Sequence, residues 1–572
     1  MPKPVPNTQT GSLTDHQRGT DDTLIGVDNA INTLYGDAFA MDDHARGGND
    51  TLIGGANATN TLYGDASAMD DHARGGNDTL IGGVNAGNVL YGDAFEMHDH
   101  ARGGNDHLFG GDDSANTLYG DAQIMDGDSR GGDDVLIGGD GSINNLYGDA
   151  FSMSGNAHGG DDTLIGGTGR GGPIADINLY GDASEMHDHA RGGNDHLFGG
   201  DGSVNSLYGD AFTMYGDSRG GNDTLVGGDG SINNLYGDAF SMSDHARGGD
   251  NTLIGGTGRG GPIADINLYG DASEMHDHAR GGNNHLFGDA GSFIFLYGDA
   301  GTMDGDTRGG NDTLIGGNGS VNNLFGDAGE MHDHARGGNN LLIGGASQIN
   351  ALYGDARVMD GDTRGGNNTL IAGPGLSIAG SVPVNALMGD AFEMHDNARG
   401  GNNLLIGGDS GINSLHGDAR TMDGNSRGGN NTLIAGAAPV NNLYGDAFSM
   451  SGNARGGDNI LISGPGTDHM WGAAAFINGV AASPTAPTGN VIIGADTFVF
   501  APGSGNDDIN DFRQSDHDKI DVSAYGIHNF AAMMITADGS GNTRIAFDAN
   551  ASVTLVGISD PHILHASDFL LA

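Results

Sequence analysis

The sequence predicts an all-β protein, a parallel β-roll or β-solenoid of about fifteen 28-residue repeats with a C-terminal β cap domain. The first observation is a Gly-Asp-Ala motif that occurs fifteen times, preceded by Leu and one variable residue and followed three positions later by Met. The second is its spacing, which is 28 residues except for two gaps of 33 and one of 35. A fixed period of this length indicates stacked coils that bury apolar residues against their neighbours.

The elements of one repeat follow from residues 60–88. Thr61-Leu62-Tyr63 and Thr79-Leu80-Ile81 are too short for helices, are flanked by turn residues, and place Leu on one face with its neighbours on the other. Met69 supplies a third apolar position between them. We expect these two leucines, the methionine and the alanine of the Gly-Asp-Ala motif to form the core of every coil.

The composition limits the classes of partner. Asp and Glu number 75 against 23 Lys and Arg, so the chain carries a net charge of −52. Such a charge repels nucleic acid phosphates and anionic membrane surfaces and favours cations as partners. The chain has no cysteine, and its sequence contains no long apolar run. We therefore expect neither a membrane span nor a leader of the Sec type.

Changes in composition divide the chain. We expect a flexible N-terminus over residues 1–18, the repeat solenoid over 19–466, a linker over 467–489 and the cap domain over 490–572. Two identical insertions, Gly166–Asp176 and Gly255–Asp265, lie between an Ile segment and the next Tyr segment. The loop between these segments is therefore predicted to tolerate extra residues.

The Gly-Gly-Asn-Asp-Thr-Leu-Ile stretch is the candidate metal site. Successive glycines expose carbonyl oxygens in a tight loop and the next Asp adds a carboxylate, which together suit calcium. Few large apolar residues occur in each repeat, so a bound ion is an expected source of stability. The alternative is a glycine turn capped by Asp without an ion. The candidate ligands in this column are Asp22, Asp50, Asp78, Asp106, Asp134, Asp162, Asp195, Asp223 and Asp312.

This stretch resembles the hemolysin-type (RTX) calcium-binding repeat, whose nonapeptide is Gly-Gly-x-Gly-x-Asp-x-Leu-x. Gly76, Asp78 and Leu80 occupy matching positions, while Ala73 and Arg74 stand where the first two glycines would be. The resemblance implies calcium between coils. In the later repeats Asn replaces the aspartate, so the first half of the array is better equipped for calcium; these asparagines are Asn251, Asn284, Asn340, Asn368, Asn403, Asn431 and Asn459.

The Gly-Asp-Ala aspartates never vary, and an arginine follows nine residues later in fourteen of the fifteen repeats, with His158 in the other. Stacked carboxylates repel one another, and an arginine in each repeat is a natural counter-charge. We expect a structural ladder of Asp and Arg. Calcium ligation by the same aspartates is the alternative.

Histidine and aspartate alternate between successive repeats. Met-His-Asp-His-Ala, as at His98 and His100, is followed by Met-Asp-Gly-Asp, as at Asp126 and Asp128. Stacked in register, these residues would either hold a transition ion such as zinc or form His-to-Asp hydrogen bonds on the surface. The second interpretation is favoured, because several repeats have one His or none.

The last segment resembles the C-terminal domain of serralysin-type metalloproteases, on residues 496–500, 503–507, 511–512 and 518–524. The resemblance implies a cap on the β-roll and an uncleaved signal for type I secretion from a Gram-negative bacterium, at the acidic and apolar end Asp568–Ala572. Asp507 and Asp511 of this segment are further candidate calcium ligands. Nothing before the repeats resembles the metalloprotease zinc motif.

These observations favour a secreted, calcium-binding and non-catalytic solenoid that acts as an extracellular structural, surface-layer, matrix or adhesive element and folds on calcium after export. Its expected partners are calcium ions, further copies of itself or a cell-surface or matrix component, with no nucleic acid and no membrane span. Two alternatives remain at this point. The chain would be the accessory or repeat part of a secreted enzyme, or a transition-metal binder that uses its His-x-His units.

Overall fold

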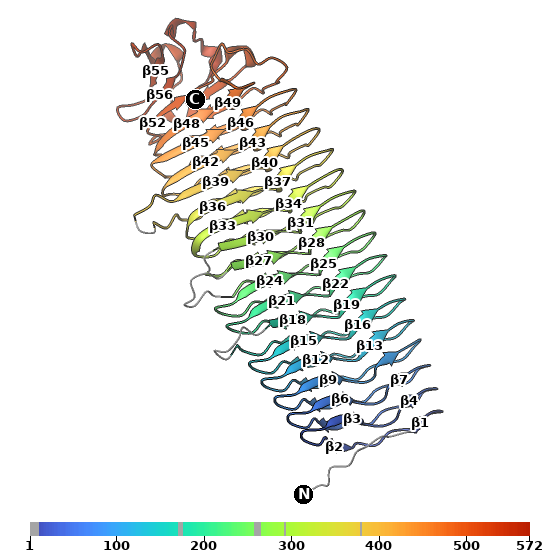
Figure 1. Ribbon diagram of the computed structural model, residues 1–572. Coiled ribbons are helices and arrows are strands. Elements are labelled where there is room, and N and C mark those ends of the chain that lie inside the picture. Colours follow the sequence, from blue (N-terminus) through green and yellow to red (C-terminus); the bar gives the residue numbers. More distant parts are fainter. Residues whose placement is uncertain (1–10, 170–175, 257–264, 291–292, 378–379) are drawn as a thin grey trace. The chain divides into compact units, whose positions relative to one another are not determined.

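Three strands and three corners make one coil, and each strand pairs in parallel with its equivalent one repeat along the chain. In a computed structural model, β6 (Thr59–Tyr63), β7 (Ala68–Met69) and β8 (Thr79–Ile81) form such a coil. Leu62 pairs with Leu90, Met69 with Met97 and Leu80 with Leu108. One repeat is therefore one coil, and each of its strands lies beside the equivalent strand of the neighbouring repeat (Figure 1).

The structure describes residues 11–169, 176–256, 265–290, 293–377 and 380–572, which divide into two units, 1–290 and 291–572. Together the units hold about sixteen turns of roughly 28 residues. The expected all-β solenoid is confirmed. Most residues of the two predicted insertion loops lie outside the described residues. The strands that flank the first loop are β17 (Thr163–Ile165) and β18 (Asp176–Tyr180), so this loop joins an Ile segment to a Tyr segment, as predicted.

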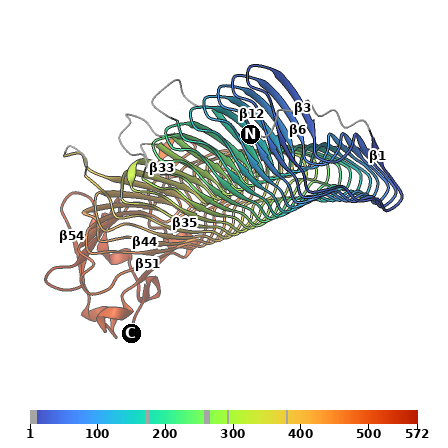
Figure 2. The ribbon, with the colours of Figure 1, turned by 90° about the horizontal axis from the view of Figure 1, so that it is seen from below.

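In the first unit the strands form three parallel sheets, named here for their most frequent outer or inner residue. The tyrosine sheet runs from β3 (Ile31–Tyr35) to β27 (Asp265–Tyr269). The methionine sheet runs from β1 (Ser12–Leu13) to β28 (Ala272–Met275), and the isoleucine sheet from β2 (Thr23–Ile25) to β29 (His285–Phe287). Figure 2 shows the coils of this unit nested behind one another.

The second unit continues the same pattern and then changes it. Its tyrosine sheet runs from β30 (Phe293–Tyr297) to β48 (Thr467–Trp471), its methionine sheet from β31 (Ala300–Met303) to β49 (Ala474–Ile477), and its isoleucine sheet from β32 (Thr313–Ile315) to β47 (Ile460–Ile462). The predicted boundaries differ from the structure at two places. The first strand begins at Ser12 instead of residue 19, and the first part of the predicted linker forms β48 and β49.

The C-terminal segment extends two of the sheets and then covers their end. In the isoleucine sheet β47 is followed by β51 (Thr497–Val499), β53 (Lys519–Asp521) and β57 (Phe569–Leu570), and in the tyrosine sheet β48 is followed by β52 (Asn506–Ile509) and β56 (Ser552–Leu555). The remaining elements are three short strands and five 3-10 helices: β50 (Val480–Ala481), β54 (Met534–Ala537), β55 (Thr543–Ala546), η1 (Gln514–Asp516), η2 (Ser523–Tyr525), η3 (Phe530–Ala532), η4 (Pro561–Ile563) and η5 (Ala566–Asp568). The antiparallel hairpin of β54, β55 and β56 ends the parallel ladder.

The core has the composition that the repeat predicts. Leu62, Ala66, Met69 and Leu80 are fully buried, and their equivalents recur as columns. Burying an aliphatic side chain of this size contributes roughly 1.5 to 3 kcal/mol. The tyrosines form a stacked column of their own, in which Tyr91 is buried and its ring lies 4.9 Å from that of Tyr63.

A column of buried asparagines was not anticipated from the sequence. Asn60 accepts a hydrogen bond from the Gly55 amide at 2.9 Å and donates to the Gly55 carbonyl at 3.0 Å. It also donates to Asn88 Oδ1 in the next coil at 2.8 Å. This ladder satisfies polar groups that would otherwise be buried without partners, and it fixes the corner between the isoleucine and tyrosine sheets.

Candidate metal centre

Two columns of polar residues are buried side by side in the coils, and both consist of aspartates in most coils of the first unit. The first column contains the Gly-Asp-Ala aspartates, such as Asp65 at 0% exposure, and the second contains the candidate calcium ligands, such as Asp78 at 1%. Both lie at corners, because the glycines before them allow the chain to turn inward. The sequence placed only the second column in the metal site, whereas the structure brings the two columns together.

Stacking orients the second column. The amide of each aspartate donates to the carboxylate of its equivalent in the next coil, as Asp50 does to Asp78 Oδ1 at 2.6 Å and Asp78 to Asp106 Oδ1 at 2.6 Å. One oxygen of each carboxylate is thereby held by the backbone. The other oxygen, Oδ2 of Asp50, Asp78 and Asp106, is buried without a hydrogen-bond partner.

The first column is held by the glycine loop. The Gly76 amide donates to Asp65 Oδ2 at 2.9 Å, and the same contact recurs in later coils. No side chain fits beside these carboxylates. A Cβ at Gly75 would lie 1.5 Å from Asp93 Oδ1, and one at Gly64 would lie 1.7 Å from the Gly92 carbonyl and 2.2 Å from Asp78 Oδ2. The glycines of both motifs therefore keep open a space that is lined by oxygen atoms.

Oxygens from three aspartates converge on this space. Asp210, Asp223 and Asp238 are all buried, and one carboxylate oxygen from each lies within 4.8 Å of the others. The Gly237 carbonyl lines the same place, since a Cβ at Gly209 would lie 1.6 Å from that oxygen and 2.4 Å from Asp223 Oδ2. Carboxylate and carbonyl oxygens from two successive coils are the ligand set that hard divalent cations use.

Burial makes these carboxylates poor anions on their own. It raises the pKa of Asp65, Asp78 and Asp106 well above the ordinary value for aspartate, and neighbouring aspartates raise it further. Burial raises the pKa of Asp149 and of Asp210 to about 6, because hydrogen bonds offset part of the effect. Facing carboxylates in this site therefore need protons or a cation at neutral pH.

Asparagine in the second column removes the repulsion between facing carboxylates without an ion. Where the second column changes to Asn251, its amide nitrogen donates to Asp238 Oδ2 at 3.1 Å and to the Gly270 carbonyl at 3.2 Å. In the second unit Asn403, Asn431 and Asn459 bond the first-column aspartates in the same way, at 2.9 to 3.1 Å. The asparagine NH₂ group occupies the position from which a cation would contact the same two groups.

The expected ladder of aspartate and arginine is wrong. Asp65 is fully buried, whereas Arg74, nine residues later, is exposed. Over the described ranges, no ion pair joins an arginine of this series to any carboxylate. The aspartates face inward and the arginines outward, so sequence separation alone misjudged which groups meet.

The predicted ligands differ in how well they fit the site. Asp50, Asp78, Asp106, Asp134, Asp162, Asp195 and Asp223 line it as buried residues of the first unit, and Asp22 lies half-buried at the first coil. In the second unit, Asp312 groups with Asp299 and Asp327 within 4.8 Å. Asp507 lies elsewhere, at the end of the asparagine ladder, where it accepts a hydrogen bond from the Ser463 hydroxyl at 2.8 Å.

The cap extends the second column with residues that the sequence analysis missed. Asp496 accepts the Asn459 amide at 2.9 Å, and its own amide donates to Asp518 Oδ1 at 3.0 Å. Asp511, which the sequence did identify as a candidate ligand, is buried at the first column instead: it accepts the Gly472 amide at 2.7 Å, and burial raises its pKa to about 6. Asp496 is followed by Thr-Phe-Val, an analogue of Thr-Leu-Ile, and that similarity was the available signal.

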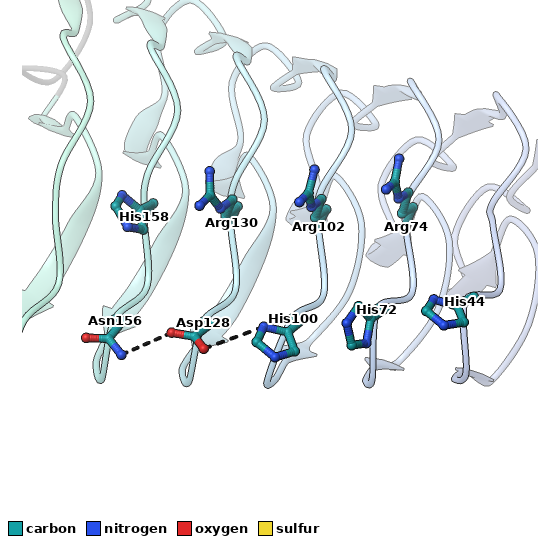
Figure 3. A pocket seen from close by; sticks show the side chains of 9 residues that line it. All are labelled: His44, His72, Arg74, His100, Arg102, Asp128, Arg130, Asn156 and His158. Carbon is teal, nitrogen blue, oxygen red and sulfur yellow. Dashed lines mark hydrogen bonds and ion pairs between the residues drawn. The ribbon is translucent and has the colours of Figure 1, made fainter.

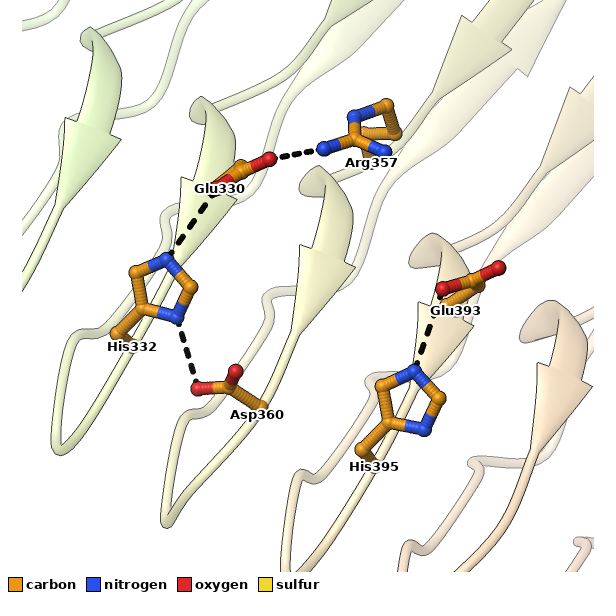
Figure 4. Close-up of polar contacts among 6 residues, drawn as sticks. All are labelled: Glu330, His332, Arg357, Asp360, Glu393 and His395. Carbon is orange, nitrogen blue, oxygen red and sulfur yellow. Dashed lines mark hydrogen bonds and ion pairs between the residues drawn. The ribbon is translucent and has the colours of Figure 1, made fainter.

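The histidines pair with carboxylates in the neighbouring coil. His98 Nδ1 lies 2.7 Å from Asp126. His332 Nδ1 lies 2.8 Å from Asp360, as Figure 4 shows. Glu330, on the strand before His332, approaches its other ring nitrogen at 3.5 Å. Among the described residues, the groups that bring three ligand atoms together contain only aspartates. The favoured interpretation of the alternating residues, surface His-to-Asp hydrogen bonds, is confirmed for these pairs.

Comparison with protein-family models, curated proteins and solved structures found no match to this chain. In the described ranges no helix has the length and apolar character needed to cross a membrane.

Proposed function

We propose that this protein is a calcium-binding, non-catalytic β-solenoid that acts outside the cell as a structural, surface-layer, matrix or adhesive element. In this proposal calcium fills the space between the two aspartate columns in the coils that carry both. The remaining coils use asparagine. The chain reaches the outside by type I export and folds when it meets calcium there.

The observation that carries the proposal is the cluster of Asp210, Asp223 and Asp238. Three buried carboxylates converge within 4.8 Å, and Oδ2 of Asp210 and of Asp223 has no hydrogen-bond partner. Burying such a group unpaired is costly, whereas a cation bound to the native state alone stabilises it. A cation also binds the folded chain selectively, because the ligands come from two coils that are adjacent only after folding.

The donor set favours calcium over softer metals. It consists of carboxylate and carbonyl oxygens, with no thiolate in the whole chain. Calcium accepts irregular oxygen cages, whereas magnesium requires near-octahedral geometry and retains much of its water. A row of equivalent sites would stabilise many coils at once, which suits a long solenoid with a small core in each turn.

Folding and calcium binding should be measured together. Protein freed of metal and returned to neutral pH should lose β-sheet circular dichroism and regain it as calcium is added, with magnesium much less effective. Calorimetry should give several ions per chain, close to the number of coils with aspartate in both columns. A metal-free protein that keeps its full β signal and melting temperature, and takes up no calcium, would refute the proposal.

A further inference from the structure

An exposed arginine row follows one edge of the first unit. Each coil contributes one member through the residue that precedes the Gly-Gly pair, and His158 replaces arginine once. Backbone bridges join each member to the next in parallel, for example Arg74 to Arg102 and Arg102 to Arg130. The arginines of this row in the first unit are Arg18, Arg46, Arg74, Arg102, Arg130, Arg191, Arg219, Arg247 and Arg280.

The row is unusual because the protein does not neutralise it. The chain carries 75 acidic residues, yet no carboxylate pairs with any of these arginines in the part that the structure describes. Figure 3 shows Arg74, Arg102 and Arg130 aligned on successive coils, pointing away from the histidine turns. Nine of the 23 Lys and Arg residues of this acidic protein are thus collected in one exposed row.

Hollows flank the row and supply further polar groups. One of about 350 Å³ is lined by Arg74, Arg102 and Arg130 on one side and by His72 and His100 on the other. A second, of about 520 Å³, continues along Arg191, Arg219 and Arg247. Another hollow beside Arg46 and Arg74 is lined by exposed Asn49, Asn77 and Asp21. The first two hollows share Asn156 and His158 and together form a groove along the row.

Acidic groups in the groove are already partnered. Asp128 lies 3.5 Å from His100 and accepts a hydrogen bond from Asn156 at 3.0 Å (Figure 3). Asp217 lies 3.7 Å from His189. These contacts hold the two carboxylates in the turn row, across the groove from the arginines. Exposed carboxylates also lie three residues after four members of the row, and these are Asp21, Asp133, Asp161 and Asp250.

We propose that the arginine row binds an extended acidic polysaccharide that carries about one carboxylate per sugar. Neighbouring parallel strands lie about 4.8 Å apart, so the row presents one guanidinium at each such step. This is close to the advance of one sugar in an extended polyuronate chain. Guanidinium groups bind carboxylates through paired hydrogen bonds, and the flanking amide and imidazole groups suit sugar hydroxyls.

Nucleic acid fits the row less well. Its phosphates follow one another at about 3.4 Å along each strand of a duplex, and at about 1.7 Å along the axis with both strands counted, which is denser than the arginines. The remaining surface, with a net charge of −52, would repel the broad charged face of a duplex. A single extended chain contacts the row while avoiding most of that surface.

The test is a binding titration of the full chain with fluorescent oligogalacturonate, in calcium at low ionic strength. The test variant changes Arg74, Arg102, Arg130, Arg191 and Arg219 to Gln. It should fold normally, because these side chains are exposed and make no ion pair in the described structure. Its affinity should fall at least about fivefold, since each exposed ion pair contributes a factor of roughly 1.4 to 5.

A matched control changes Arg357 and Arg420 to Gln, two exposed arginines on strands of the methionine sheet in the second unit. It should bind like the natural protein. A neutral dextran should not bind, and added salt should weaken the polyuronate complex steeply. Circular dichroism of each sample separates this proposal from the calcium proposal, because a folded protein that does not bind would overturn only the polysaccharide.

Three results would overturn the inference. They are no binding by the folded natural protein at low salt, equal binding by the five-residue variant, and binding of single-stranded DNA as tight as that of the polyuronate. The last result would assign the row to a different class of polymer. Arg-to-Lys replacement at the same five positions should retain part of the affinity, because it keeps the charge and loses the paired hydrogen bonds.

Discussion

Asn251 donates a hydrogen bond from its amide nitrogen to Asp238 Oδ2 at 3.1 Å, thirteen residues earlier in the same coil. One coil before, the equivalent position is Asp223, whose Oδ2 faces Asp210 without a hydrogen-bond partner. The two coils differ by one atom type at the point where the columns meet. In one coil an NH₂ group neutralises the contact, and in the other two carboxylates need a cation or a proton.

Asp223→Asn should therefore raise the stability of the calcium-free protein. The new amide would donate to Asp210 and to the Gly237 carbonyl, as Asn251 does to its own partners. Because each new hydrogen bond is to a charged or buried group, we expect the free energy of unfolding to rise by about 1.5 to 3 kcal/mol. Urea unfolding without metal measures this change. The variant should also bind less calcium.

The reverse change, Asn251→Asp, is the matched control. It should lower stability without metal, because Asp238 would face a second buried carboxylate, and it should create additional calcium uptake. If both changes shift the stability of the calcium-free protein in the same direction, the exchange of amide for carboxylate does not determine that stability, and the prediction is wrong.

Calcium-free protein should be more stable in acid than at neutral pH. Burial raises the pKa of Asp50 to about 7 and that of Asp149 to about 6, from an unfolded value near 3.9. A carboxyl whose pKa is raised by folding binds its proton more tightly in the folded state, so its contribution is fully present below about pH 3.9 and is lost as pH rises through about 6 to 7. Urea midpoints in metal-free buffer should fall between pH 5 and pH 8.

Calcium should flatten or reverse that slope, because the ion takes the place of the protons and competes with them at low pH. The histidine pairs act in the same direction as the aspartates. Partial burial lowers the pKa of His332, but its hydrogen bond to Asp360 and the nearby Glu330 outweigh this and raise it. A calcium-free protein that gains stability from pH 5 to pH 8 would contradict the arrangement of buried carboxyls.

Gly75→Ala should destabilise the solenoid, because the new Cβ would lie 1.5 Å from Asp93 Oδ1 and 2.6 Å from Asp65 Oδ2. The backbone or both carboxylates must move, at a cost of roughly 1 to 3 kcal/mol or more. Gly87→Ala in β9 (Gly87–Tyr91) is the control, since a Cβ there meets no atom within 4 Å. Thermal melts with calcium should separate the two, and equal melting temperatures would show that the glycine does not keep the site open.

Replacing His98, His100, His187 and His189 by Ala should leave metal uptake unchanged. His98 pairs with Asp126 at 2.7 Å and His100 with Asp128 at 3.5 Å, so their ring nitrogens already have carboxylate partners. Each surface pair should contribute no more than about 1 kcal/mol to stability. Zinc calorimetry on the natural protein and the variant tests this, and a tight zinc site that disappears in the variant would restore the transition-metal interpretation.

The fold was predictable because its signal repeats. Leu62, Met69 and Leu80 recur at one spacing, and only stacked coils bury all three columns together. The cap boundary was harder to place. Thr467–Trp471 continues the tyrosine sheet with Met470 and Trp471 in place of Leu and Tyr. The strand is therefore present where the sequence motif can no longer be recognised.

The sequence predicted one of the two aspartate columns of the candidate site and missed the other. Asp78 follows a glycine pair and matches a known ligand pattern, but Asp65 was assigned to Arg74 because opposite charges in one repeat attract. The coil has three corners, and whether a side chain at a corner points inward depends on the backbone, which spacing does not reveal. The asparagine ladder through Asn60 was not predicted for the same reason. An Asn before a β segment is also common in exposed turns, so its burial cannot be inferred from its position.

The exchange of Asp for Asn also means that some coils of the first unit require a bound cation to fold and others do not. The coils containing Asn251 and Asn284 lie at the C-terminal end of that unit, behind a continuous series of coils with aspartate in both columns. Coils that carry their own neutralising group can order before any ion arrives and then present an open strand edge as a template. The array would thus assemble with a direction, and the concentration of calcium would set how many further turns are completed.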